Sequence, residues 1–315
     1  MARLASFAKT LAKNTERKVE CYLKEIGQES RKPMPNLPKD FERFNKIIGL
    51  PSVSGKSPTI FSYQKEIDLA INEHHKVLIN KSRKIGATET VLRSIAKNCF
   101  ERYAGYNIMI VAGNRQAQAE ELLTRFNKLF EKGFVDLDGT KYTYHDIIKK
   151  KTKSELVFFN DTRIHTYPAV AEALRGPDRV VCVFLDEAAH FKQNDDSVVY
   201  DALKPNLANT NGDFVIVSTP NGRRGIFYDL YKEVDRPWKK EIYKKLELPY
   251  TRALGNLLSE EFIAGEKEDP RIDFEQEYEC KFTSISSHAI DIDAIIYKPE
   301  YLNQWEDILG PESVQ

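Results

Sequence analysis

Residues 77–89 read VLINKSRKIGATE, and this stretch decides the fold class of the chain. The apolar run over residues 76–80 predicts a short, buried β-strand. A tight basic turn with a single glycine, Gly86, follows it, and the composition of residues 90–103 predicts a helix. A strand, a glycine turn and a helix in this order present free backbone N–H groups at a helix N-terminus, and such an arrangement binds phosphate groups.

The turn departs from the strict P-loop pattern G-x-x-x-x-G-K-[ST]. Lys81 stands in the position of the first glycine and Ala87 in that of the lysine, whereas Gly86 and Thr88 fit the pattern. Because alanine carries no charge, one of the three cations in the turn must face the nucleotide phosphates. A surface basic patch is the alternative. The predicted nucleotide-binding residues of the turn are Lys81, Ser82, Arg83, Lys84, Ile85, Gly86, Ala87, Thr88 and Glu89.

Length and cysteine usage exclude several classes of protein. The chain has 315 residues, enough for one large domain or for one domain with appendages. No run approaches the about 18 apolar residues of a membrane-spanning helix, so we predict no membrane partner. The four cysteines are far apart and form no C-x-x-C pair, which argues against a zinc site or a disulfide framework. A reducing compartment, the cytoplasm, follows from this.

Charge is unevenly distributed although the net charge is zero. Residues 1–100 carry 19 Lys and Arg against 10 Asp and Glu, whereas residues 256–315 carry 4 against 15. A basic first part and an acidic end fit a molecule that meets DNA on one side and a different partner on the other. Ordinary solvated helix faces are the alternative, and the basic cluster over residues 149–153 has the same two interpretations.

Further apolar runs have the length and composition of strands, and helix-forming segments separate them. The predicted strands cover residues 107–113, 180–185, 214–217 and 240–246, and the predicted helices cover residues 41–48, 61–72, 115–130, 194–207 and 226–233. A hairpin is predicted over residues 155–166, with its turn at Asn160-Asp161. Because strand–helix units repeat along the chain, we predict an α/β fold with a mainly parallel sheet flanked by helices.

Two adjacent carboxylates, Asp186 and Glu187, follow a continuous apolar strand. The carboxyl edge of a parallel sheet is where α/β folds bind ligands. Oxygen atoms are the ligands that Mg²⁺ prefers, so Asp186 and the Thr88 hydroxyl are the predicted metal ligands. Glu187 is then the predicted catalytic base, which orients or deprotonates the water that attacks the γ-phosphate of ATP. An acidic decoration of a helix N-terminus is the alternative interpretation of the pair.

Four other residues are candidates for the same chemistry. Ser218 and Thr219 end the next predicted strand, where they can contact the γ-phosphate or the attacking water; simple strand termination by a Pro-Asn-Gly turn is the alternative. Arg175, in the loop before the acidic strand, is a candidate arginine finger, although a lone arginine is usually a surface residue. Gln64 is a candidate for the adenine side of the site, with an ordinary exposed glutamine as the alternative.

The order of these motifs resembles that in the ATPase domain of the large terminase subunit, the motor that packages DNA into tailed-virus capsids. The resemblance covers about residues 55–285 and implies a P-loop NTPase of the additional-strand, catalytic-glutamate type. The motifs that carry it are Tyr63-Gln64, residues 81–88, Arg175-Gly176, residues 183–189, residues 218–222, Phe227-Tyr228 and the run Phe274-x-Gln276-Glu277-Tyr278-x-x-x-Phe282.

The resemblance also implies a role for each candidate residue. Some members of that family carry a lysine at the start of a deviant Walker A loop, so Lys81 would be the substitute lysine, with Lys84 as the alternative. Arg83 matches the arginine of an S-R-x-x-G-K-T form and is included among the predicted catalytic residues. The remaining assignments are Asp186-Glu187 as Walker B, Ser218-Thr219 as the coupling motif, Gln64 at the adenine, and Arg175 in activation between subunits of a ring.

We predict three parts of the chain: a helical appendage and linker over residues 1–50, the ATPase domain over residues 51–285, and an acidic tail or the start of a nuclease domain over residues 286–315. Family members usually continue into a nuclease that holds two metal ions. About 30 residues follow Phe282, and although Asp291 and Asp293 lie among them, no such fold can be built in that length. We therefore expect no nuclease activity from this chain.

The function that the resemblance implies is hydrolysis of ATP with Mg²⁺ to translocate double-stranded DNA into a viral procapsid, in the cytoplasm of the infected host cell. The implied partners are DNA, contacted non-specifically through its phosphates, the portal protein and the small terminase subunit, with a homo-oligomeric ring as the active form. Two alternatives stay open. One is another DNA-dependent P-loop ATPase of the helicase kind, and the other is a non-hydrolysing, nucleotide-gated scaffold or adaptor.

Overall fold

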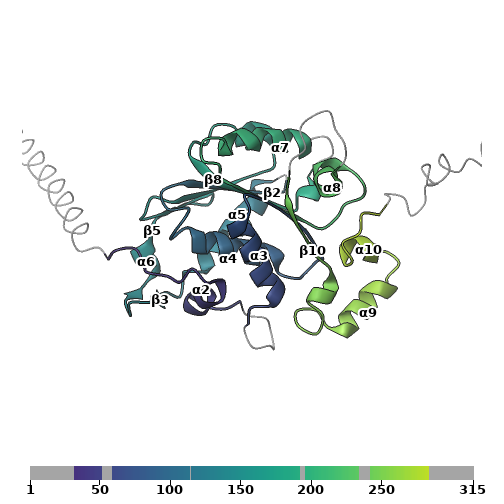
Figure 1. The fold of residues 1–315 in the computed structure, drawn as a ribbon, viewed down its shortest axis with the longest axis horizontal. Helices are drawn as coiled ribbons and strands as arrows, with labels where there is room; N and C mark the ends of the chain where they lie inside the picture. The colour runs from purple at the N-terminus through teal and green to yellow at the C-terminus, as the bar shows by residue number, and fades with distance from the viewer. Residues whose placement is uncertain (1–31, 52–58, 114, 192–195, 234–241, 284–315) are drawn as a thin grey trace, which may run out of the picture.

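The fold is a sheet between two layers of helices (Figure 1). The computed structural model describes residues 32–51, 59–113, 115–191, 196–233 and 242–283. Residues 1–31 of the predicted helical appendage, Asn114, and the acidic tail with Asp291 and Asp293 lie outside these residues. Within the described ranges, no helix has both the length and the apolarity that crossing a membrane requires.

Eight strands form the central sheet in the order β10-β1-β9-β8-β2-β7-β6-β5. All neighbours from β10 to β7 pair in parallel, and β6 and β5 continue the sheet in antiparallel fashion. The prediction of a mainly parallel sheet is therefore confirmed. The strand bounds are β1 Lys76–Lys81, β2 Asn107–Ala112, β5 Ile148–Lys151, β6 Glu155–Phe158, β7 Arg163–Tyr167, β8 Val180–Asp186, β9 Asp213–Ser218 and β10 Lys244–Leu248.

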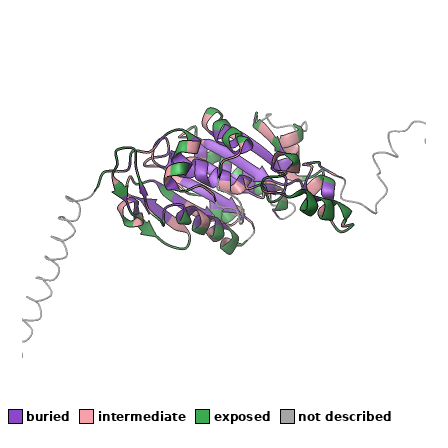
Figure 2. Ribbon diagram, turned by 90° about the horizontal axis from the view of Figure 1, so that it is seen from below, coloured by how far each residue is buried: buried purple, intermediate pink, exposed green. Residues whose placement is uncertain are grey.

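The position of β9 decides the class of the fold. β9 lies between β1, which leads into the basic turn, and β8, which ends in the acidic residue Asp186. It is the additional strand that the resemblance implied. The central strands are buried along almost their whole length, because helices cover the sheet on both faces (Figure 2).

Two hydrophobic cores fill the space between the sheet and the helices. One core packs α2 (Phe41–Ile48), α3 (Ser62–Glu73), α4 (Ala87–Asn98) and α5 (Gln116–Lys128) on one face of the sheet. The other core packs α7 (Asp196–Leu203) and α8 (Gly225–Lys232) on the opposite face. The smaller elements are β3 Phe134–Val135, β4 Lys141–Tyr142, α6 Tyr144–Ile147, η1 Ala171–Leu174, η2 Ala188–His190, η3 Lys204–Leu207, η4 Tyr250–Arg252, α9 Glu260–Glu268 and α10 Phe274–Glu277.

The register of the parallel strands brings their polar carboxyl ends to one level. Asn80 of β1 lies opposite Ser218 of β9, and Asp186 of β8 lies opposite Val217 of β9. On the other side of β8, Asp186 lies opposite Ala112 of β2. The basic turn, the acidic pair and the predicted coupling motif therefore meet at a single edge of the sheet, as ligand sites of α/β folds do.

Several predicted boundaries differ from the structure. α4 begins at Ala87 rather than at residue 90, because Gly86 adopts the left-handed conformation that starts the helix directly after the turn. The predicted helix over 194–207 ends as α7 at Leu203 and continues as a 3₁₀ turn that contains Pro205. The strand predicted at 240–246 is β10, Lys244–Leu248.

Residues 32–50 pack as part of the ATPase core, although we predicted them within an appendage. Phe44 and Ile48 of α2 belong to the same buried cluster as the strands β1 and β2. The preceding segment is held to the turn that follows β3, since the Asn36 N–H donates to the Asp136 carboxylate and the Leu137 N–H donates to the Asn36 carbonyl. The other domain boundaries stay predictions.

Phe158 on β6 provides a test of the core. Its ring packs against the rings of Phe100, Phe126 and Phe130 and is fully buried. Phe158→Ala should lower the free energy of unfolding by ~3–5 kcal/mol, because it leaves a cavity among these rings. Leu69→Ala, at an apolar residue that is 55% exposed, should change it by no more than about 0.5 kcal/mol. Urea denaturation measures both, and equal losses would contradict this packing.

Candidate active site at the carboxyl edge of the sheet

The turn between β1 and α4 has the backbone features of a phosphate-binding loop. Gly86, with φ 75°, is the N-cap of α4, and the first N–H groups of this helix face the end of the sheet. Two contacts fix the path of the turn: the Ser82 N–H donates to the Leu248 carbonyl at 2.8 Å, and the Tyr63 hydroxyl donates to the Ile85 carbonyl at 2.7 Å. The sequence motif Tyr63-Gln64 thus lies directly beside the turn.

Of the three cations in the turn, only Lys81 is buried. Its ammonium group donates to Glu187 Oε1 at 2.7 Å, and the residue is 6% exposed. Lys84 is exposed and has φ 61°. The side chain of Arg83 is also exposed, and its Nε lies 3.6 Å from Glu277 of α10. Lys81 is therefore the lysine of the turn that reaches the acidic pair.

The two predicted metal ligands lie in contact. The Thr88 hydroxyl donates to Asp186 Oδ1 at 2.9 Å. Burial and then the neighbouring charge of Glu187 raise the pKa of Asp186 to about 6. Burial also acts to raise the pKa of Glu187, but the charge and the hydrogen bond of Lys81 outweigh it, and the pKa is lowered. Glu187 is therefore the carboxylate of the pair that stays ionised at neutral pH.

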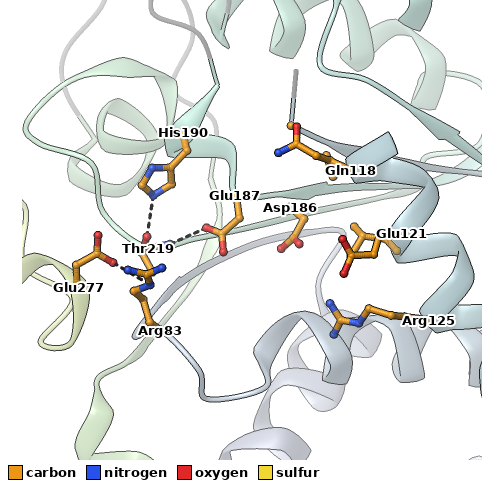
Figure 3. Close-up of a pocket in the computed structure, with 12 residues that line it drawn as sticks. Arg83, Gln118, Glu121, Arg125, Asp186, Glu187, His190, Thr219 and Glu277 are labelled. Atoms are coloured by element: carbon orange, nitrogen blue, oxygen red, sulfur yellow. Dashed lines mark hydrogen bonds and ion pairs between the residues drawn. The ribbon is translucent and has the colours of Figure 1, made fainter. Parts of the chain in front are cut away.

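Glu187 also has an uncommon backbone conformation. Its φ of 55° and ψ of 43° are left-handed, which is uncommon for residues other than glycine. This conformation begins the short 3₁₀ helix η2, whose N-cap is Glu187. The carboxylate is thereby presented at the end of the strand beside Asp186, as the close-up shows (Figure 3).

The predicted coupling motif lies next to Glu187. The Ser218 hydroxyl is 3.5 Å and the Thr219 N–H nitrogen 3.4 Å from Glu187 Oε2. The Thr219 hydroxyl is hydrogen-bonded to His190 Nε2 at 2.7 Å (Figure 3). His190 was not among the predicted site residues, because its contact with Thr219 depends on the 3₁₀ turn η2 lying beside the end of β9, which no local sequence signal gives.

A cleft of about 580 Å³ opens along the carboxyl ends of β2, β8 and β9. Helix α5 forms one wall of it, and the basic turn with α10 forms the other (Figure 3). The residues that line the cleft are Arg83, Ala112, Gly113, Gln118, Glu121, Leu122, Arg125, Asp186, Glu187, His190, Thr219 and Glu277. The residues from α5 were missed by sequence reasoning, because only the packing of this helix on β2 and β7 brings them to the cleft.

Of the predicted site residues, Arg83, Asp186, Glu187 and Thr219 line this cleft, and the others, Lys81 and Thr88 among them, do not. Gln64 is buried, accepts a hydrogen bond from the Phe61 N–H at 3.0 Å, and lies beside Gly86. Arg175 is exposed, at the end of η1. Glu89 binds Arg93 and Arg125 with its two carboxylate oxygens. Roles at the adenine for Gln64 and between subunits for Arg175 stay predictions.

Comparison with known proteins identifies the family of this chain. The profile of the family described as "Terminase large subunit, T4likevirus-type, N-terminal" matches residues 78–296. The chain belongs to this family. Membership of this family makes it a terminase-type ATPase motor for DNA packaging, as the motif order implied. No match was found among the curated proteins.

Two solved structures show the same fold. The large terminase ATPase domain of Thermus phage P74-26 aligns with a TM-score of 0.50 at 20% identity, over 77% of this chain and 98% of that domain. The large terminase of a second thermophilic bacteriophage aligns with a TM-score of 0.52 at 12% identity, over 69% of this chain and 52% of that protein. At these identities the likeness is one of fold, and it confirms the predicted fold class.

The raised pKa of Asp186 predicts how stability depends on pH in metal-free protein. The folded protein holds a proton on Asp186 up to about pH 6, whereas the unfolded chain loses it near pH 3.8, so wild-type stability falls between these values as pH rises. With a chelator at pH 7.5, Asp186→Asn should therefore raise the free energy of unfolding by about 1–3 kcal/mol. The gain should shrink below pH 6 and vanish near pH 4.

The matched control is Asp201→Asn, which removes an exposed carboxylate from α7 and should change little at any pH. Urea denaturation of the three proteins at four pH values measures the difference. If Asp186→Asn were less stable than wild type at pH 7.5, or if its gain did not depend on pH, the buried and unfavourable ionisation of Asp186 would be disproved.

Proposed function

We propose that this chain hydrolyses ATP at the carboxyl edge of β1, β9 and β8, and that turnover drives double-stranded DNA into a viral procapsid. The observation that carries the proposal is the meeting of Lys81 with Glu187 and of Thr88 with Asp186. A cation, a catalytic carboxylate and two oxygen ligands converge there from the two sequence motifs of a P-loop ATPase, although the usual P-loop lysine is replaced by Ala87.

The residues present fit a magnesium ion. Thr88 and Asp186 supply the oxygen donors that Mg²⁺ prefers, and their oxygens are already 2.9 Å apart. Asp186 is a buried carboxylate whose ionised form is unfavourable, and a divalent cation beside it would stabilise that form. When bound, Mg²⁺ would neutralise charge on the nucleotide phosphates. Within the described residues no cluster of three protein ligands exists, so phosphate oxygens and water would complete the coordination.

Glu187 is the proposed general base. Its lowered pKa leaves it ionised at neutral pH, so it can orient a water molecule and accept its proton. Lys81 supplies the cation for the phosphates in place of the missing Walker lysine, since its ammonium group is buried on the same side of the turn as Glu187, whereas Lys84 is exposed. Arg83, at the cleft wall, is a further cation for the transferred phosphate.

Coupling of hydrolysis to movement is proposed to begin at Ser218 and Thr219, which lie within 3.5 Å of the Glu187 carboxylate. A change in the charge or position of Glu187 would reach β9 through these contacts. Arg175 is exposed, and we propose that it acts on the site of a neighbouring subunit in a homo-oligomeric ring. Gln64, which lies beside Gly86 of the turn, would contact the adenine of the nucleotide.

The proposed partners follow from the family and from charge. Lysine and arginine side chains would contact DNA phosphates, so binding should weaken with salt and should not depend on sequence. The portal protein and the small terminase subunit are the proposed protein partners, and the cytoplasm of the infected host cell is the proposed place of action. None of these contacts requires a membrane.

Substitution of the two central residues tests this function. Glu187→Gln should reduce ATP turnover at least about 100-fold while ATP binding is kept, because the base is lost but the phosphate-binding groups remain. Lys81→Ala should weaken both binding and turnover, since it removes the buried cation, whereas Lys84→Ala, which removes an exposed one, should have little effect. Steady-state ATPase rates with and without double-stranded DNA, with ATP titrations, measure all three.

Different outcomes reject different parts of the proposal. Wild-type turnover in Glu187→Gln would reject Glu187 as the base. Full activity in Lys81→Ala together with loss in Lys84→Ala would move the substitute lysine to Lys84. Absence of any ATPase activity in the wild type, with ATP binding intact, would favour the non-hydrolysing adaptor over the motor.

A further inference from the structure

Arg125 stands on the α5 wall of the cleft and was not singled out by any sequence motif. It lines the cleft together with Asp186 and Glu187. In the close-up it lies on the opposite side of this acidic pair from Arg83 (Figure 3). The cleft therefore has one arginine on each wall, with the two carboxylates of the proposed catalytic centre between them.

A chain of contacts holds Arg125 at this place. Its Nη2 lies 3.2 Å from Glu89 Oε2, and the other oxygen of Glu89 accepts from Arg93 Nε at 2.9 Å. Arg93 is itself anchored, since its Nη1 donates to Asn45 Oδ1 at 2.7 Å and to the Gly49 carbonyl at 2.8 Å. The Arg93 side chain is only 8% exposed. Arg93 thus holds one carboxylate oxygen of Glu89 in place, and the other oxygen contacts Arg125.

Binding of a nucleotide in this acidic cleft requires a further positive charge. Asp186, Glu187, Glu121 and Glu277 line it, and a nucleotide polyphosphate brings more negative charge. Lys81 and Arg83 are the cations already proposed for the phosphates, but Lys81 also pairs with Glu187, Arg83 also pairs with Glu277, and Ala87 supplies no charge at the usual lysine position. The side chain of Arg125 is 37% exposed, so its pair with Glu89 leaves donors free toward the cleft. A guanidinium group can bind Glu89 and a phosphate oxygen together.

We propose that Arg125 contacts the γ-phosphate of ATP from the same subunit, and that Glu89 is its positioning residue. This inference rests on the proposed ATPase function of the site. The γ-phosphate is the expected partner because Arg125 lines the same cleft as Glu187, the base proposed for the water that attacks this phosphate. The N–H groups at the start of α4 lie instead at the turn. A pair with Glu89 alone would give little stability, because a half-exposed ion pair is weak.

Nucleotide selectivity tests the contact. In the Glu187→Gln background with Mg²⁺, Arg125→Ala should weaken ATP binding about tenfold to 100-fold and leave ADP binding unchanged, because only ATP carries the γ-phosphate. Isothermal titration with each nucleotide measures both dissociation constants. The matched control is Lys128→Ala, which removes an exposed cation one turn further along α5 and should change neither. Thermal unfolding checks that each variant is folded.

Glu89 is tested through its effect on Arg125. Glu89→Gln keeps an oxygen for Arg93 but weakens the hold on Arg125, so it should raise the ATP dissociation constant less than Arg125→Ala does. The double variant Glu89→Gln/Arg125→Ala should bind ATP no more weakly than Arg125→Ala alone, because the two residues act through one contact. Arg125→Lys, which keeps the charge, should restore part of the ATP affinity. Additive losses in the double variant would overturn the positioning role.

Failure of this inference can be told from failure of the proposed function. If Arg125→Ala behaves as Lys128→Ala does, or weakens ATP and ADP equally, the γ-phosphate contact is wrong, while an inactive Glu187→Gln still supports the ATPase. If Glu187→Gln hydrolyses ATP at the wild-type rate, the proposed function itself fails. A selective loss of ATP affinity in Arg125→Ala supports both.

Discussion

Parallel pairing of β1, β9 and β8 is the constraint on which the site depends. The three strands start from distant parts of the sequence, but their register brings Lys81, Ser218 and Asp186 to the same edge of the sheet. No loop has to carry these groups toward one another, because each stands at the end of a buried strand or one residue beyond it. The ion pair between Lys81 and Glu187 then follows from the strand order, since only β9 separates β1 from β8.

The site keeps groups that are unfavourable for stability. Asp186 is buried beside a second carboxylate, and Glu187 has a left-handed backbone conformation that residues other than glycine rarely adopt. Lys81 offsets part of this cost by neutralising Glu187. Local strain and perturbed pKa values of this kind are typical of catalytic centres, where function rather than stability selects the residues. The carboxyl edge of the sheet therefore carries groups that lower the stability of the fold and that the proposed chemistry requires.

Most of the fold and the main motifs could be predicted from the sequence, because continuous apolar strands and their polar ends are local signals. The strand that ends in Asp186 and the turn around Gly86 are of this kind. His190 and Arg125 could not be found in this way, since their contacts with Thr219 and Glu89 depend on which helices lie beside which strands. Packing also decides that Arg93 is a buried anchor, which composition would assign to a solvated helix face.

We propose that Lys81, at the end of β1, takes the role of the P-loop lysine that Ala87 at the start of α4 cannot fill. A crystal structure of the wild-type chain with Mg²⁺ and a non-hydrolysable ATP analogue measures this directly. We predict that Lys81 Nζ lies within hydrogen-bond distance, about 3 Å, of a β- or γ-phosphate oxygen, and that Lys84 remains in solvent. A structure in which Lys84 contacts the phosphates, while Lys81 contacts only Glu187, would contradict this proposal.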